Sequence, residues 1–163
     1  MCIRDSINSG VSQAEGIKAY EEAAETLNRI GALCKQENIV FCYHNHAWEF
    51  EEVDGTKGIH RLAERTDPEL VKLCVDVYWV HVGGEDPAEF IRRYKGRAVY
   101  FHFKDGGKGW FTELGKGEVD LKGAKEAALE VGAEWIIYEQ DRTEKDPKES
   151  AVESLRYLRE LGL

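Results

Sequence analysis

Four side chains able to bind a metal ion recur along the chain, each at the polar end of a short apolar segment. They are His44, Asp76, His102 and Glu139. Two imidazoles and two carboxylates form a mixed nitrogen and oxygen donor set, which suits Mn²⁺, Co²⁺, Zn²⁺ or Fe²⁺. A lone His or Asp in such a position is more often a helix cap or a hydrogen-bonded core residue. Four such residues, each at the same place relative to its apolar segment, instead favour a divalent metal site.

The apolar segments before these side chains are short and rich in β-branched and aromatic residues, as strands are. They cover residues 39–43, 71–75, 98–103 and 135–138. Side chains alternate between the two faces of a strand, so each candidate shares a face with the residue two positions before it. The opposite face, with Phe41, Leu73 and Phe101, is apolar and suited to packing under helices. Parallel strands are therefore expected to bring all four candidates to one edge and one face of a sheet.

Amphipathic or capped segments between these strands predict helices. The expected helices cover residues 14–36, 58–65, 87–94, 121–131 and 147–161. Strand-plus-helix units recur about every 30 residues, the length of a βα crossover. We therefore predict an α/β fold with a parallel sheet of about four strands and five helices. It is either a small open sheet or half of a (β/α)8 barrel, because a full barrel needs about 250 residues.

Length and charge limit the organisation and the partners of the chain. Its 163 residues are expected to form one domain, and 31 acidic against 22 basic residues give a net charge of −9. This charge argues against duplex nucleic acid and anionic membranes as partners. No apolar run approaches the roughly 18 residues of a membrane span, and no secretory leader is evident, so a cytoplasmic location is expected. Cys42 and Cys74 are expected to be small buried residues.

Six motifs follow one another along the chain: Tyr43–Phe50, Asp76–Val80, Gly83–Pro87, His102–Asp105, Glu113–Asp120 and Glu139–Asp141. In this order they resemble the C-terminal half of the sugar phosphate isomerase/epimerase family, from about Ala14 to Leu161. The resemblance implies a xylose-isomerase-like TIM barrel in which a Glu, an Asp, a His and a Glu hold a divalent cation, Mn²⁺, Co²⁺, Mg²⁺ or Zn²⁺. The last three positions match Asp76, His102 and Glu139.

Two positions depart from the family pattern. His44 stands where many relatives have the first Glu, and Trp79 stands where many have a second His. In the ketose epimerases of this family the first and last Glu act as an acid/base pair on the two sides of the substrate carbon. The departure at His44 therefore weakens an epimerase assignment.

The resemblance implies a metal-dependent isomerase or epimerase that acts on a keto-sugar or polyol through an enediolate. One alternative is a dehydratase of keto-sugars or inositol-type polyols, which uses the same enolate chemistry and then eliminates a hydroxyl. Another is an inactive truncated fragment that binds metal or sugar without turnover. The superfamily also contains endonucleases for abasic DNA, but the net charge of −9 and Trp79 oppose that branch.

Several residues near the expected metal site are candidates for catalysis or substrate binding. Glu139 is the first choice as base, and His46, Glu49 or Lys104 is expected to return the proton on the other side. The alternative for Lys104 is an ion pair with Asp105 or Asp141, and for Glu49 a solvated loop carboxylate.

Aromatic rings are expected to contribute to substrate binding from loops after the strand ends. Trp48 and Trp79 are candidates for stacking on a sugar, Trp110 is a weaker one, and Asp141 is assigned to substrate binding. The glycine-rich segment 104–119 is expected to form a mobile loop over the site. His60 is expected to be a surface or packing residue.

A full barrel of this family has four further βα units before Ala14, so we expect a truncated gene or fragment in which residues 1–13 are disordered or non-native. Half a barrel exposes two sheet edges and one face of its apolar interior. Such surfaces favour association into a homo-oligomer or aggregation.

Overall fold

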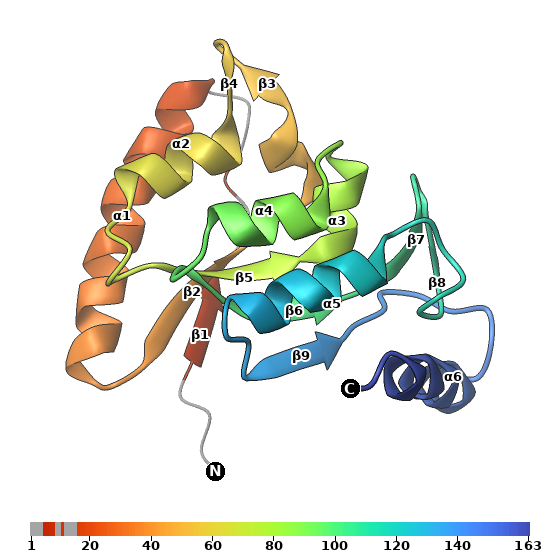
Figure 1. Ribbon diagram of the computed structural model, residues 1–163. Helices are drawn as coiled ribbons and strands as arrows, with labels where there is room; N and C mark the ends of the chain where they lie inside the picture. Colours follow the sequence, from red (N-terminus) through yellow and green to blue (C-terminus); the bar gives the residue numbers. More distant parts are fainter. Residues whose placement is uncertain (1–4, 9–10, 12–15) are drawn as a thin grey trace.

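Every pair of neighbouring strands in the main sheet runs parallel. The computed structural model describes residues 5–8, 11 and 16–163. The order of the strands is β1-β2-β5-β6-β9 (Figure 1). Their bounds are Asp5–Asn8 for β1, Val40–His44 for β2, Lys72–Asp76 for β5, Ala98–Phe103 for β6 and Trp135–Tyr138 for β9. The α/β fold of parallel βα units is thus confirmed, with β1 as an additional strand.

Helices follow the strands and cover one face of the sheet (Figure 1). They are α1 (Ile17–Gln36), α2 (Gly58–Arg65), α3 (Val77–Val82), α4 (Pro87–Arg93), α5 (Leu121–Glu130) and α6 (Pro147–Glu160). The buried core lies between the helices and the strand residues predicted to face them, among them Phe41, Leu73 and Phe101. The helix α6 lies beyond the β9 edge of the sheet (Figure 1).

Three elements differ from the sequence-based expectation. The strand β1 pairs in parallel with β2, although it lies within the segment expected to be disordered or non-native. The other residues of 1–13, apart from Val11, lie outside the described part of the chain. The first helix begins at Ile17 rather than near residue 14, and α3 occupies a segment that was expected to be a loop.

The first part of the glycine-rich segment after β6 is a hairpin rather than an irregular loop. The strands β7 (Asp105–Gly107) and β8 (Trp110–Thr112) pair antiparallel. The carboxylate of Asp105, which is 1% exposed, accepts hydrogen bonds from the backbone N–H groups of Gly106, Gly115, Gly117 and Val119. A Cβ at Gly117 would collide with this carboxylate. The glycines therefore allow the backbone to close around one buried acid.

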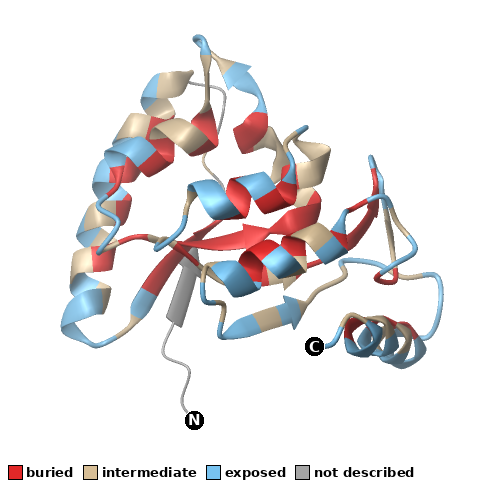
Figure 2. Ribbon diagram, in the orientation of Figure 1, coloured by how far each residue is buried: buried red, intermediate tan, exposed pale blue. Residues whose placement is uncertain are grey.

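The face of the sheet opposite the helices is partly open. Figure 2 shows exposed positions along β9 and at the start of β2. Val40, Trp135 and Ile137 are each more than one third exposed, whereas Cys42 and Cys74, as predicted, are buried. Within the described residues no further strand pairs with the outer edges of β1 and β9. In the same part of the chain no helix is long and apolar enough to cross a bilayer.

A short turn and a second hairpin complete the structure near the end of β2. A 3-10 helix covers Ala47–Phe50, and the two-residue strands β3 (Glu52–Val53) and β4 (Thr56–Lys57) pair antiparallel. Gly58 begins α2 beneath the buried ring of Tyr20, where a Cβ would collide with that ring. Close packing of this kind holds α2 against α1.

Candidate metal centre

The four side chains predicted to bind a metal converge at the carboxyl ends of four adjacent strands. One potential ligand atom from each of His44, Asp76, His102 and Glu139 lies within 4.8 Å of the others. The parallel register places Asp76 opposite His102, whereas His44 lies opposite Cys74, so Asp76 is two residues further along β5 than the position opposite His44. Convergence of the four residues was predicted from strand parity.

The two carboxylate oxygens of Asp76 have different tasks. Its Oδ1 accepts hydrogen bonds from the backbone N–H groups of Tyr78 and Trp79 at 3.0 and 3.1 Å and so caps α3. Its Oδ2 faces the cluster, 3.5 Å from His44 Nε2 and 3.2 Å from Lys104 Nζ. Because this cap starts a helix directly after β5, Trp79 lies on α3, and the prediction that it lies in a loop was wrong.

Asn45 holds the ends of β2 and β5 together, a role that the sequence analysis missed. Its side chain accepts a hydrogen bond from Asp76 N at 3.0 Å and donates one to Asp76 O at 3.2 Å. The residue is only 2% exposed. A buried amide between two histidines, directly after an apolar strand, was the available signal.

Glu49 is buried inside the turn after β2. Its Oε1 accepts a hydrogen bond from the Tyr43 hydroxyl and its Oε2 accepts one from the His46 backbone N–H, both at 2.6 Å. Burial raises the pKa of Glu49, and burial together with Glu49 raises the pKa of Tyr43. The alternative of a solvated loop carboxylate is therefore wrong, and the contacts indicate that Glu49 positions the turn that carries His46.

Lys104 is the buried cation of the site. Its ammonium lies 3.2 Å from Asp76 Oδ2, 3.2 Å from Glu139 Oε2 and 2.8 Å from Asp141 Oδ2. Of the two ion-pair partners considered from the sequence, Asp141 is the one present. Although burial alone lowers the pKa of Lys104, Asp76 and Asp141 outweigh it and the net shift is upward. The ammonium also lies over the rings of Trp79 and Phe111, at 5.1 and 5.7 Å from their centroids.

Glu139 is held as a carboxylate by its neighbours. His102 Nδ1 lies 3.0 Å from its Oε2. This hydrogen bond lowers the pKa of Glu139 to about 2. Lys104 contributes to the lowering, whereas burial opposes it. Glu139 is thus ionised at neutral pH, and these two partners keep its basicity low.

His46 lies at the rim of the cluster and is stacked on Trp48, with ring centroids 4.1 Å apart and an interplanar angle of 8°. Its ring meets that of His44 edge-on at 4.8 Å. Burial and the neighbouring His44 lower the pKa of His46 to about 4, so its imidazole is neutral at pH 7. Trp48 lies in the 3-10 helix, and stacking of Trp48 or Trp79 on a sugar stays a prediction.

The donor set fits a divalent cation. His44 Nε2 and Asp76 Oδ2 are both buried and have no hydrogen-bond partner among the described residues. The buried His44 nitrogen is costly without a partner, whereas Asp76 Oδ2 has the Lys104 ammonium as its ion-pair partner at 3.2 Å. With His102 and Glu139 they offer the mixed nitrogen and oxygen ligands that Mn²⁺, Co²⁺ and Zn²⁺ accept.

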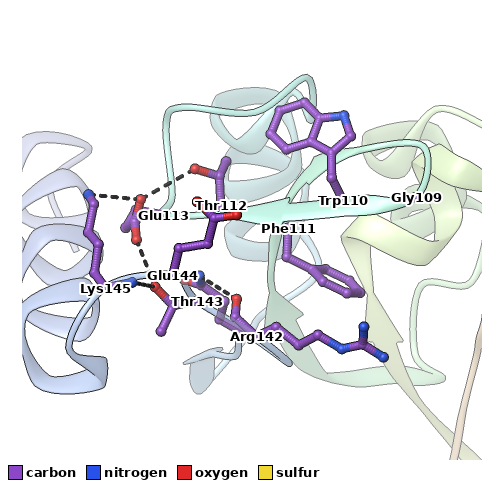
Figure 3. Close-up of a pocket in the computed structure, with 10 residues that line it drawn as sticks. Gly109, Trp110, Phe111, Thr112, Glu113, Arg142, Thr143, Glu144 and Lys145 are labelled. Atoms are coloured by element: carbon purple, nitrogen blue, oxygen red, sulfur yellow. Dashed lines mark hydrogen bonds and ion pairs between the residues drawn. The ribbon is translucent and has the colours of Figure 1, made fainter.

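A pocket of about 530 Å³ lies between the β7–β8 hairpin and the segment after β9, and none of the four clustered residues lines it. Figure 3 shows its lining, which includes Phe111, Glu113, Arg142 and Lys145. Glu113 accepts a hydrogen bond from the Ser150 hydroxyl at 2.8 Å and lies 3.2 Å from Lys145 Nζ. Burial opposes ionisation of Glu113, but these two partners lower its pKa to about 2.

An aromatic side chain lies between the pocket and Lys104. Phe111 lines the pocket and also faces Lys104 and Trp79. Trp110 lies on β8 and is 44% exposed, although a loop was expected there. Phe111 is thus the residue that links the lining of the pocket to Lys104.

The remaining histidines lie elsewhere. His60 packs against Phe90 and contacts the Glu85 carboxylate at 2.9 Å, as expected for a packing residue. His81 lies 3.9 Å from Glu118 Oε2 and is not among the four clustered residues.

Comparison with known proteins identifies relatives with the same type of barrel. A family model described as xylose isomerase-like TIM barrel matches residues 6–161. An inosose dehydratase of Clostridium tetani is 31% identical over 163 residues, which cover 86% of this chain and 54% of the relative. An inosose dehydratase of Geobacillus thermodenitrificans is 31% identical over 156 residues, covering 82% of this chain and 52% of the relative.

A solved structure resembles the chain closely. A sugar phosphate isomerase/epimerase from Parabacteroides distasonis superposes with a TM-score of 0.86 at 26% identity, covering 96% of this chain and 57% of that protein. The chain thus spans about half the length of the curated relatives it matches.

Proposed function

Because the chain belongs to the xylose isomerase-like TIM barrel family, we propose that it carries the metal-binding residues of an enzyme that removes a proton beside a carbonyl group. The substrate class is a keto-sugar or a keto-polyol. The observation that carries this proposal is the cluster of two imidazoles and two carboxylates at one edge of the sheet. Names of relatives, which include isomerases, epimerases and dehydratases, support the substrate class.

Within this class we favour dehydration of a keto-polyol, and two observations support it. Both curated relatives described above are inosose dehydratases. At the first strand end His44 replaces the carboxylate that a two-sided epimerisation needs, while Lys104 places a buried ammonium beside Glu139. An ammonium can protonate a departing hydroxyl, which dehydration requires and epimerisation does not. Epimerisation or isomerisation is the second candidate, favoured by the similarity to the Parabacteroides distasonis structure.

The residues have the following roles in this proposal. A bound divalent cation, held by His44, Asp76, His102 and Glu139, supplies Lewis acidity for the carbonyl and for the enediolate. Glu139 takes the proton from the carbon beside the carbonyl once its contact with His102 or Lys104 is lost. Lys104 gives a proton to the β-hydroxyl, which leaves as water while a carbon–carbon double bond forms. The neutral His46 is a second candidate for proton transfer, and Asp141 holds Lys104.

Two readouts test the proposal with the full chain, added Mn²⁺ or Co²⁺ and a panel of keto-inositols and keto-sugars. Exchange of the substrate C–H with deuterated water, followed by proton NMR, reports proton removal in either branch. A near-ultraviolet band from the conjugated enone or dione reports dehydration alone. We expect both signals with wild type and neither with Glu139→Gln, while Glu51→Gln, an exposed carboxylate change, serves as the matched control.

The outcomes separate the candidates. Exchange without the absorption band would favour epimerisation or isomerisation over dehydration. Absence of both signals across the panel, with metal bound, would refute the proposed enzyme activity for this chain.

A further inference from the structure

The ammonium of Lys104 occupies a position where it shares oxygens with the candidate metal centre. It is 3.2 Å from Asp76 Oδ2 and 3.2 Å from Glu139 Oε2. These same oxygens face the imidazoles of the cluster, at 3.5 Å from His44 Nε2 and 3.0 Å from His102 Nδ1. Lys104 is only 1% exposed, so water cannot replace these contacts. The ammonium and a divalent cation therefore need the same two oxygens.

The third partner of Lys104 lies outside the set of candidate ligands. Asp141 Oδ2 is 2.8 Å from the ammonium, the shortest of its three carboxylate contacts. Around this contact the rings of Trp79 and Phe111 face the ammonium at 5.1 and 5.7 Å. A carboxylate and two aromatic faces can hold an ammonium without help from the metal ligands.

We propose that Lys104 is an internal counter-ion that competes with the divalent cation, and that Asp141 is the positioning residue that draws the ammonium away when the cation binds. This inference rests on the metal site of the proposed function. In the metal-bound protein the ammonium stays with Asp141, beside the rings of Trp79 and Phe111.

Charge balance predicts opposite changes in metal affinity when Lys104 and when Asp141 is replaced. Asp76, Glu139 and Asp141 carry three negative charges around one ammonium. A divalent cation a few ångströms from that ammonium is repelled by it, strongly so in a buried site. Removal of the ammonium should strengthen metal binding. Removal of Asp141 should weaken it, because the ammonium then remains on Asp76 and Glu139.

The test is a double-mutant cycle on the full chain with four proteins: wild type, Lys104→Met, Asp141→Asn and the double variant. Co²⁺ affinity is measured by isothermal titration calorimetry on protein treated with chelator, and Co²⁺ absorption reports the ligand set. We expect Lys104→Met to bind Co²⁺ about tenfold more tightly and Asp141→Asn about fivefold more weakly than wild type. Asp141→Asn should change the affinity less than twofold when Lys104 is already Met.

Controls keep the result interpretable. Lys116→Met removes an exposed ammonium that pairs with Glu153 and should leave Co²⁺ affinity unchanged. Thermal unfolding checks that each variant is folded, and Lys104→Gln replaces Lys104→Met if the latter does not fold.

Three results would overturn the inference or its premise. Co²⁺ affinity of Lys104→Met equal to or weaker than that of wild type would refute competition. Equal weakening by Asp141→Asn in both backgrounds would show that Asp141 acts by its own charge rather than through Lys104. If neither wild type nor Lys104→Met binds Co²⁺, the proposed metal site itself fails.

Discussion

Replacement of Asn45 by Ala should destabilise the protein and loosen the metal centre. Asn45 is 2% exposed and makes two hydrogen bonds to the backbone of Asp76, accepting from its N–H at 3.0 Å and donating to its C=O at 3.2 Å. In the variant both backbone groups lose these partners at the buried end of β5. An unsatisfied buried polar group costs about 1–3 kcal/mol, so we expect a loss of about 3 kcal/mol in the free energy of unfolding.

Asn28 provides a matched control because it makes the same kind of two-bond clamp at the surface. Its side chain donates to Arg65 O at 3.1 Å and accepts from Asp67 N at 2.7 Å, and both contacts are exposed. Water can replace them, so Asn28→Ala should cost less than about 1 kcal/mol.

Urea unfolding followed by circular dichroism gives both free energies, and Co²⁺ titration gives the metal affinity of each variant. We expect the affinity to fall with Asn45→Ala only, because Asn45 sets the position of Asp76. A loss of stability for Asn45→Ala no larger than that for Asn28→Ala would refute the argument from burial.

Three further predictions concern other parts of the molecule. Asp76→Ala should abolish metal content measured by elemental mass spectrometry and, because the N-cap of α3 is lost, lower the unfolding free energy by about 1–2 kcal/mol; retained stoichiometric metal would exclude Asp76 as a ligand. The pKa of Glu113 is lowered to about 2 in the folded protein, so its stabilising effect is present above the ordinary pKa of a glutamate and is lost as the pH falls toward 2. Glu113→Gln should flatten the decline in stability between about pH 5 and pH 2 in acid unfolding, whereas Glu51→Gln should follow wild type. Finally, the open sheet face around Val40 and Ile137 should drive self-association, visible as a concentration-dependent mass in analytical ultracentrifugation, and a strictly monomeric chain would contradict this.

Local sequence patterns were sufficient for most strands and helices. The predicted bounds are correct for the strands 98–103 and 135–138 and for the helix 58–65. The signals that set these bounds are the alternation of apolar residues and the turn residues at the ends, and they lie within a few positions of each element. Errors arose where one residue serves two purposes. Asp76 was interpreted as a ligand alone, and its capping of α3 was missed. The glycines after Lys104 were interpreted as a loop because Asp105, which organises them, acts on residues up to 14 positions away.

The sequence by itself determined the parallel βα order, the buried face of each strand and the set of four residues at one sheet edge. Strand parity and crossover length are properties of the backbone, so they can be inferred from spacing. Only the tertiary structure decided which partners these residues have. Asn45 forms a hydrogen bond with Asp76, 31 positions away, and Lys104 forms an ion pair with Asp141 rather than with Asp105. The buried carboxylate of Glu49 accepts a hydrogen bond from the Tyr43 hydroxyl. Such choices depend on strand register and on burial, because the loss of water makes a polar group take whichever partner the packing brings within reach.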